Sequence, residues 1–199
     1  MKQIVLATGN AGKVKEFATL LADFPIRVAP QSEFEVPEAI EDGLTFVENA
    51  IIKARNAAQA TGLPAIADDS GIEVDALNGK PGIYSARFAG EPSNAENNWR
   101  KLLQEMEGKP ERSARFQCVL VFMRHAEDPT PIICQASWEG EILDHARGEQ
   151  GHGYDPVFLV RGDTRSAAEM GSDDKNRLSH RGKAMKLLLA ELKEKGIIQ

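Results

Sequence analysis

Two adjacent aspartates, Asp68 and Asp69, are the residues of this sequence best suited to acid–base or metal chemistry. We predict that Asp68–Gly71 forms a turn between two short strands, with the two carboxylates pointing in opposite directions. One carboxylate then faces the core, and the other faces a cleft where it could hold Mg²⁺ together with Glu41 or Glu48 and substrate phosphates. An Asx turn with capping carboxylates explains the same residues without any chemistry.

A loop of small residues near the N-terminus is suited to binding phosphate. Thr8-Gly9-Asn10-Ala11-Gly12 follows an apolar segment and precedes Lys13, where helical spacing of apolar residues begins. Such a junction offers free backbone N–H groups and the positive end of a helix dipole, and Lys13 adds a full charge. The loop is neither a Walker A sequence nor a G-x-G-x-x-G fingerprint. A plain strand-to-helix turn with a surface lysine therefore stays open as an alternative.

Two further groups of residues could recognise a purine base. His152, Tyr154 and Asp155 lie in a glycine-flanked loop, where aromatic faces could stack on the base and the carboxylate could accept from its edge. The segment 175–183 gathers positive charge at the start of the last helix, which suits an anion or a base edge. The alternatives are a structural turn with a buried tyrosine and a solvated basic helix start, although cations at a helix N-terminus oppose its dipole.

The elements that must position these residues are predicted from the spacing of apolar residues and from caps. Strands and helices alternate in the first half, and two long strands form a hairpin across residues 125–131. The fold class is therefore α/β, a mixed sheet flanked by helices, with residues 1–199 as a single domain of two lobes. The predicted strands are 3–8, 26–30, two runs on either side of 68–71, 115–124, 131–143 and one ending at 160, and the predicted helices start near Lys13, Thr45, Ser93 and Ser179.

Composition excludes several classes of protein. The chain has 199 residues, 42% of them hydrophobic and 27% charged, and a formal net charge of -6, so its surface as a whole repels nucleic acid. It shows no secretory signal and no apolar run of roughly 18 residues, so we expect no membrane span and a cytoplasmic location. Cys118 and Cys134 stand in strand-like runs without other metal-ligand residues, which favours reduced core cysteines over a disulfide.

The segments quoted above, taken in order and with their spacing, resemble the inosine/xanthosine triphosphate pyrophosphatases. The resemblance rests on ATGNAGKVKEF, EDGLTFVENAIIKA, PAIADDSGIEVDALNGKPGIYSARFAG, GHGYDPVF and LSHRGKA, and it covers essentially the whole chain. It implies hydrolysis of the deaminated purine nucleotides ITP, dITP and XTP to the monophosphate and pyrophosphate, with Mg²⁺ as cofactor. It also implies a homodimer of elongated subunits, each with a central active-site cleft between two lobes.

The resemblance also implies a role for each matching residue. Glu41 and Asp69 would hold the metal, and Asp69 would also accept the proton of the attacking water. Lys53 would reach the phosphates, and Ser70 would contact the substrate. His152 departs from the family, which usually has phenylalanine at the base-stacking position. The remaining substrate-binding residues would be Thr8, Gly9, Asn10, Ala11, Gly12 and Lys13 around the triphosphate, and His152, Gly153, Tyr154, Asp155, Lys175, His180 and Arg181 around the base.

The residue patterns and the family resemblance both predict that water attacks the α-phosphorus and that pyrophosphate leaves. Lys175, His180 or Arg181 could donate to the 6-oxo oxygen of the base, and Asp155 could accept from N1–H, so adenine presents the wrong pattern. Two alternatives stay open: a pyrophosphatase for other modified nucleotides, and a non-catalytic nucleotide sensor. The presence of both Asp69 and Glu41 favours an enzyme, because a pure binding protein needs no activated water.

Overall fold

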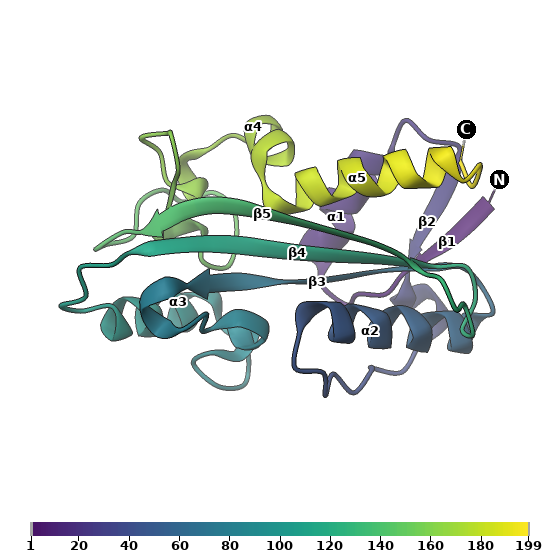
Figure 1. Ribbon diagram of the computed structural model, residues 1–199, viewed down its shortest axis with the longest axis horizontal. Helices are drawn as coiled ribbons and strands as arrows, with labels where there is room; N and C mark the ends of the chain where they lie inside the picture. The colour runs from purple at the N-terminus through teal and green to yellow at the C-terminus, as the bar shows by residue number, and fades with distance from the viewer. Residues whose placement is uncertain (1, 199) are drawn as a thin grey trace. The chain divides into compact units, whose positions relative to one another are not determined.

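The computed structural model describes residues 2–198, in which six strands form one mixed sheet (Figure 1). The strand order is β2-β1-β3-β4-β5-β6. β1 runs parallel to β2 and to β3, and β5 is antiparallel to β6. The α/β prediction is confirmed. The strands are β1 (Lys2–Leu6), β2 (Ile26–Pro30), β3 (Ala65–Val74), β4 (Ser113–Met123), β5 (Ile132–Ile142) and β6 (Phe158–Val160), and the α-helices are α1 (Ala11–Leu21), α2 (Phe46–Thr61), α3 (Ala95–Glu105), α4 (Ser172–Leu178) and α5 (His180–Glu194).

The chain divides into two compact units, which are described separately. The first unit holds residues 1–69, 118–136 and 181–199, and the second holds 70–117 and 137–180. β3, β4 and β5 contribute residues to both units. The single domain of two lobes and the cleft between the lobes stay predictions. No helix within residues 2–198 is long and apolar enough to cross a lipid bilayer.

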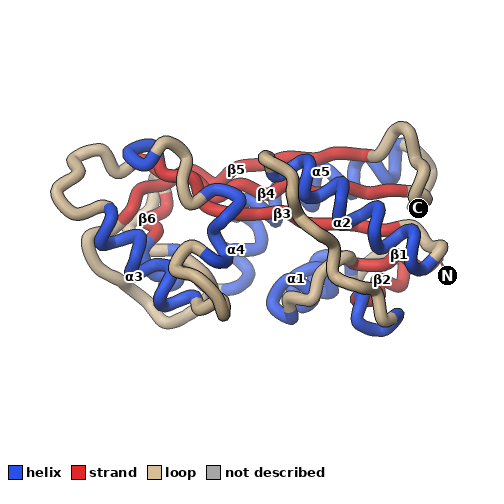
Figure 2. Tube along the Cα trace, turned by 90° about the horizontal axis from the view of Figure 1, so that it is seen from below, coloured by secondary structure: helices blue, strands red, loops and turns tan. Residues whose placement is uncertain are grey.

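The first unit is built on the parallel strands β2, β1 and β3. The chain passes from β1 through α1 to β2, and then returns through α2 to β3 on the other side of β1. α1 contacts β2, as Figure 2 shows. Local signals set the helix ends as predicted: Thr45 accepts a hydrogen bond from the backbone N–H of Glu48, and Gly62 ends α2 with a left-handed φ of 67°.

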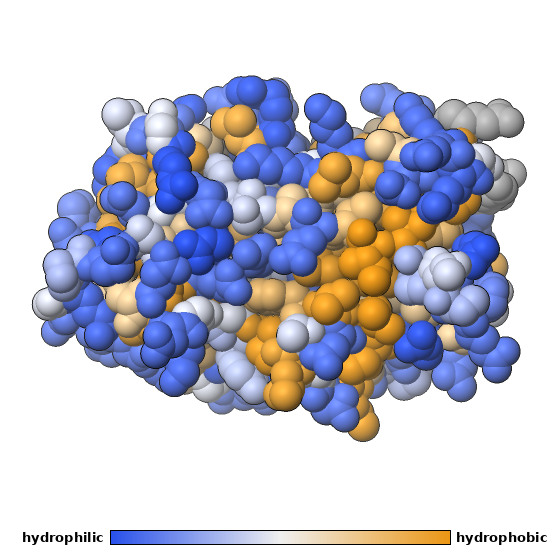
Figure 3. Space-filling view, viewed as in Figure 1, coloured by the Kyte–Doolittle hydropathy of each residue, from blue (hydrophilic) through white to orange (hydrophobic). Residues whose placement is uncertain are grey.

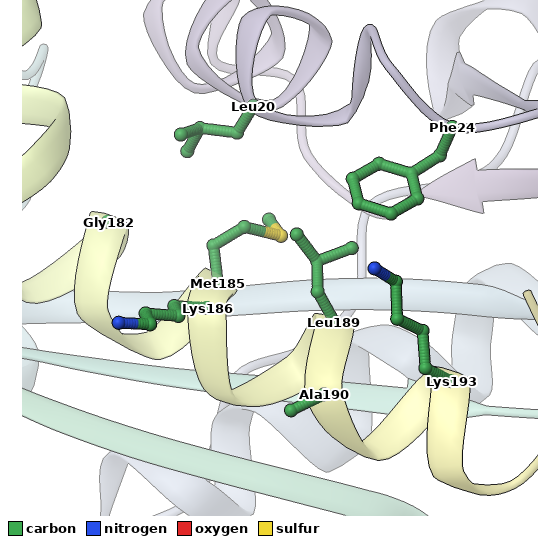
Figure 4. Close-up of a pocket in the computed structure, with 8 residues that line it drawn as sticks. All are labelled: Leu20, Phe24, Gly182, Met185, Lys186, Leu189, Ala190 and Lys193. Atoms are coloured by element: carbon green, nitrogen blue, oxygen red, sulfur yellow. The ribbon is translucent and has the colours of Figure 1, made fainter. Parts of the chain in front are cut away.

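Two faces of these strands carry different helices. Alternate residues such as Ile4 and Ile66 form one core with Phe17 of α1 and Leu188 of α5. The other face is covered by α2, whose Ala50, Ala54 and Ala57 are fully buried, and α2 and α5 lie on opposite sides of the strands (Figure 1). At the edge of the first core, Leu20 and Phe24 point toward Met185 and Leu189, and Lys193 lies 5.0 Å from the Phe24 ring centre (Figure 4).

The second unit has its own core, which includes aromatic residues of β4, β5 and β6. Phe116 and Trp138 pack with Phe158 and with apolar residues of α3 and of the segment around Tyr154. The predicted hairpin is confirmed, because β4 and β5 are sheet neighbours joined by a short turn segment. The predicted strand ending at 160 is also confirmed as β6.

Three local predictions were wrong. Asp68–Gly71 is not a turn, because β3 continues without interruption from Ala65 to Val74. The helix after Gly90 is capped by Asn94, whose side chain accepts from Asn97, because the Ser93 hydroxyl is used on the Ala86 carbonyl. The basic segment is not one helix start, because the extended Ser179 separates α4 from α5.

Candidate active site

The phosphate-binding loop forms as a short, exposed junction between β1 and α1. Asn10 is the N-cap of α1: its side chain accepts from the backbone N–H of Lys13 at 3.1 Å, while its own N–H donates to the Thr8 hydroxyl at 3.1 Å. The N–H groups of Ala11 and Gly12 in the first turn have no acceptor among the described residues, as expected at a helix start. The loop therefore presents donors and a positive dipole end to solvent.

This loop lies at the position where open α/β sheets bind ligands. β1 ends at Leu6, and the chain then leaves the sheet at the carboxyl end of parallel strands. α1 connects β1 to β2 on one side, and α2 connects β2 to β3 on the other side of β1, so the end of β1 is a topological switch point. β3 continues past this point, and Asp68 and Asp69 stand two and three residues after Ile66, the register partner of Leu6.

Asp69 is held by a lysine that it shares with Glu41. Lys53 of α2 lies with its Nζ 2.7 Å from Asp69 Oδ1 and 2.8 Å from Glu41 Oε1. Burial raises the pKa of Asp69 above its ordinary value although Lys53 acts in the opposite direction. For Lys53, burial lowers the pKa, but the two carboxylates outweigh burial and the pKa is raised. The structure thus brings together three residues predicted from the sequence for metal and phosphate binding.

The arrangement fits a hard divalent cation. Asp69 Oδ2 is buried and has no hydrogen-bond partner within the described residues, which leaves one carboxylate oxygen available to a ligand. Glu41 reaches the same ammonium, so its carboxylate is also close by. No set of three or more histidine, cysteine or acidic side chains suited to a metal occurs in residues 2–198. Two carboxylates without a third are what magnesium uses when substrate phosphates and water complete its shell.

Asp68 lies on the opposite face of β3 and has different partners. Its Oδ1 accepts from the Lys13 ammonium, and its Oδ2 accepts from Arg181 Nε at 2.7 Å and from Cys118 Sγ at 3.4 Å. Arg181 also donates to Glu16 of α1. The side chain of Asp68 is fully buried, and the guanidinium of Arg181 and the ammonium of Lys13 hold its pKa well below the ordinary value despite that burial.

Arg181 is therefore placed differently from the other residues assigned to the base. It is 5% exposed and belongs to the first unit, where two carboxylates bind it. Ser70 is half-buried in β3, directly after Asp69. The base-binding role of Arg181 and the substrate contact of Ser70 stay predictions.

In the second unit, the structure brings Asp155, Lys175 and His152 together. Asp155 Oδ2 accepts from Lys175 Nζ at 2.5 Å and from the backbone N–H of His152 at 2.8 Å. Asp155 and Lys175 are 2% and 8% exposed, so this is a buried ion pair that closes the loop after Gly151. The His152 side chain is exposed, and Gly153 has a left-handed φ of 63° that only glycine adopts readily.

His180 and Tyr154 are packed into the core of the second unit. The His180 ring stacks on Phe116, with ring centres 4.9 Å apart and 12° between planes. The centre of the Trp138 ring lies 6.4 Å from that of His180, with 20° between the planes. Tyr154 is 5% exposed and donates its hydroxyl to the Ser85 carbonyl at 2.6 Å, and burial raises its pKa. This buried tyrosine matches the alternative interpretation of the loop as a structural turn. Stacking of Tyr154 on the base stays a prediction.

Sequence reasoning missed several partners of the predicted residues. Phe116 and Trp138 support His180, and Glu16 and Cys118 complete the surroundings of Arg181 and Asp68. The only available signal was the alternation of side chains along a strand, which separates Asp68 from Asp69 but does not identify what each carboxylate meets.

Comparison with known proteins shows the family of this chain. The sequence profile of the Ham1 family matches residues 4–191, and the chain belongs to this family. A dITP/XTP pyrophosphatase of Vibrio parahaemolyticus is 63% identical over 194 residues, covering 96% of this chain and 97% of that protein. A dITP/XTP pyrophosphatase of Shewanella oneidensis is 61% identical over 198 residues, covering 99% of this chain and 97% of that protein.

Solved structures show the same fold. The structure of a HAM1 protein from Coxiella burnetii superposes with a TM-score of 0.92 at 48% identity, covering 98% of this chain and 100% of that chain. The structure of the Staphylococcus aureus Ham1 protein gives a TM-score of 0.88 at 40% identity, with the same coverage of 98% and 100%. The resemblance drawn from the sequence motifs is confirmed.

Proposed function

We propose that this protein hydrolyses deaminated purine nucleoside triphosphates (ITP, dITP and XTP) to the monophosphate and pyrophosphate. The observation that carries the proposal is the state of Asp69: one carboxylate oxygen is held by Lys53, and the other is buried without a hydrogen-bond partner within residues 2–198. Two relatives more than 60% identical are dITP/XTP pyrophosphatases, which supports the same reaction.

In this reaction the chain's own residues position the triphosphate and the attacking water. The free N–H groups at the start of α1 and the Lys13 ammonium bind phosphate oxygens. Lys53 keeps Asp69 in one orientation, and Asp69 accepts the proton of the water that attacks the α-phosphorus. A raised pKa brings the carboxylate closer to the range in which it accepts a proton effectively.

Glu41 and Asp69 are the residues that would hold Mg²⁺, which when bound neutralises charge on the phosphates and on the leaving pyrophosphate. Most of the rate acceleration then comes from positioning and charge stabilisation, as is usual in phosphoryl transfer. Lys13 and Lys53 contribute to this charge stabilisation. They come from different helices and supply positive charge on the two faces of β3.

For the base, we propose that residues of the second unit select a 6-oxo purine. With Lys175 donating to the 6-oxo oxygen and Asp155 accepting from N1–H, the pair fits a 6-oxo purine, whereas adenine presents its donor and acceptor in the reverse order. His180 offers an imidazole edge held by Phe116. His152 is exposed, and we propose that its ring stacks on the purine.

We also propose that the protein is a homodimer in the cytoplasm. Ile40 and Leu44, each 81% exposed, are large apolar residues on either side of Glu41 in the segment before α2. Figure 3 shows apolar residues gathered on the face that carries α2 in the same view. Exposed apolar residues in such a group are typical of a protein interface.

The experiment that tests the function incubates purified protein and Mg²⁺ with ITP, dITP, XTP, ATP and GTP in separate reactions. Pyrophosphate and orthophosphate are both measured. We expect pyrophosphate from the first three substrates and little from ATP or GTP. Orthophosphate instead of pyrophosphate would contradict attack at the α-phosphorus. Binding of ITP without any product would favour a non-catalytic nucleotide sensor. Turnover of other modified nucleotides alone would favour a pyrophosphatase with a different substrate.

A further inference from the structure

Within the first unit, the phosphate-loop lysine is held at both ends. Its backbone N–H donates to Asn10 Oδ1, and its ammonium donates to Asp68 Oδ1 and lies 3.4 Å from the Asp68 carbonyl oxygen. The Lys13 side chain is 18% exposed, so these contacts hold a long and flexible side chain in a defined position.

Asp68 is itself immobilised by groups from elements other than α1. Arg181 of α5 and Cys118 of β4 both donate to Oδ2, on the side of the carboxylate away from Lys13. The side chain of Asp68 has no exposed surface and that of Arg181 is 6% exposed. Glu16 supplies a second carboxylate to Arg181, so two cations and two anions alternate in this cluster.

We propose that Asp68 is a positioning residue that acts through Lys13: it orders the lysine ammonium in advance for the triphosphate. This inference rests on the proposed function, because it deepens the role of the phosphate loop. Ordering a lysine costs rotamer entropy, and a protein that orders it during folding removes that cost from ligand binding. A buried carboxylate also partly neutralises Lys13. This second effect opposes the benefit of ordering, because it weakens the attraction of the ammonium for phosphate.

The direction in which Asp68→Asn changes phosphate affinity shows which of these two effects is larger. A carboxylate has two acceptor oxygens, one for the Lys13 side and one for the Arg181 side, whereas an amide has only one acceptor and presents an N–H₂ group to the other cation. The variant therefore removes the negative charge and also releases Lys13. If positioning dominates, phosphate affinity falls; if neutralisation dominates, phosphate affinity rises.

The test uses inorganic tripolyphosphate as the probe, titrated calorimetrically into the full-length protein in EDTA so that no turnover interferes. We expect Asp68→Asn to weaken tripolyphosphate binding by about tenfold. In a Lys13→Met background the same substitution should change the affinity by less than about twofold, because there is no ammonium left to position. Tighter binding of the single variant, or an equal loss in both backgrounds, would overturn the proposal.

Glu16→Gln is the matched control. It also converts a carboxylate of this cluster to an amide, but Glu16 contacts Arg181 and not Lys13, so tripolyphosphate affinity should stay within about twofold of the wild type. A loss equal to that of Asp68→Asn would show that the general charge balance matters, and would contradict positioning. Thermal unfolding of each variant confirms that it is folded.

If Asp68→Asn does not fold alone, the comparison is made in an Arg181→Gln background, where no buried guanidinium is left unpaired. The same tenfold loss is expected there, and unchanged affinity would overturn the proposal. The readout also separates this inference from the proposed function: failure to release pyrophosphate from ITP concerns Asp69 and the base, whereas tripolyphosphate binding in EDTA concerns only Asp68, Lys13 and the loop.

Discussion

Asp68 and Asp69 are neighbours on one strand, yet their carboxylates lie on opposite faces of β3 and bind different helices. Asp68 contacts Lys13 of α1 and Arg181 of α5, and Asp69 contacts Lys53 of α2. Burial raises the pKa of Asp69, whereas two cations lower that of Asp68. We therefore propose two roles for the pair, one carboxylate for the reaction and one for the phosphate loop.

Asp69→Asn should abolish most of the activity while leaving substrate binding largely intact. Loss of a positioned proton acceptor typically costs about 10²–10⁴ in kcat. Pyrophosphate release from ITP under saturating Mg²⁺ measures this loss, and circular dichroism checks that the variant is folded. A variant that keeps more than a tenth of the wild-type kcat would rule out Asp69 as the proton acceptor.

Lys53→Met should make the stability of the protein depend more strongly on Mg²⁺. The substitution removes the cation that Glu41 and Asp69 share, so two nearby carboxylates repel each other until a divalent ion replaces it. We expect Mg²⁺ to raise the Tm of the variant by about 2–4 °C more than that of the wild type, corresponding to about 1 kcal/mol. Melting curves in Mg²⁺ and in EDTA provide the comparison, and equal shifts in both proteins would argue against a shared metal site.

Asp155→Asn should destabilise the protein more than the double variant Asp155→Asn/Lys175→Met. Removing one partner of a buried ion pair typically costs about 3–5 kcal/mol, because the other charge remains buried. Lys175 is 8% exposed and donates to Asp155 at 2.5 Å, so the single variant leaves a buried ammonium without its carboxylate. Urea unfolding of both variants measures the difference, and a double variant no more stable than the single one would contradict it.

His152→Phe should improve binding of the base. A phenyl ring offers more apolar stacking area than imidazole and carries no charge near neutral pH, so we expect KM for ITP to fall by about 2–10-fold. The residue is exposed, which leaves the fold unaffected. Steady-state kinetics from pH 6 to pH 8 compare the KM for ITP of the wild type and of the variant. An unchanged KM across this range would mean that residue 152 does not contact the base.

Asp128→Asn should destabilise the turn between β4 and β5 in a pH-dependent way. Asp128 accepts from the backbone N–H groups of Arg124 and Thr130, both at 3.0 Å, and from the Arg124 guanidinium. Hydrogen bonding to Arg124 lowers the pKa of Asp128 below its ordinary value of 3.8, so the carboxylate contributes stability above pH 3.8 and loses this contribution as the pH falls toward the lowered folded-state pKa.

The expected loss in this variant is about 1–2 kcal/mol at pH 7, since two partly buried backbone hydrogen bonds lose their ionised acceptor. The difference in unfolding free energy between wild type and variant should be constant above about pH 5 and should shrink in acid. Urea unfolding at several pH values measures it. A difference that grows as the pH falls would have the wrong sign for a lowered pKa.

Local patterns were sufficient to predict most of the elements. The capping signal of Thr45 and Glu48, the helical spacing after Lys13 and the apolar runs on either side of 125–131 each depend on residues a few positions apart. The predicted turn at Asp68–Gly71 was wrong, because consecutive polar residues and a glycine are typical of turns. Within β3 these polar side chains are bound by partners distant in the sequence. The single-domain prediction and the cleft between lobes stay predictions.

The sequence by itself determined the family, the α/β class and the residue types available for chemistry, because short motifs and periodicity are local properties of the chain. Only the tertiary structure decided which of two adjacent aspartates meets which cation. Asp68 contacts Lys13 from 55 residues away and Arg181 from 113 residues away. Such pairings depend on how strands and helices pack, and no local pattern in the chain encodes them.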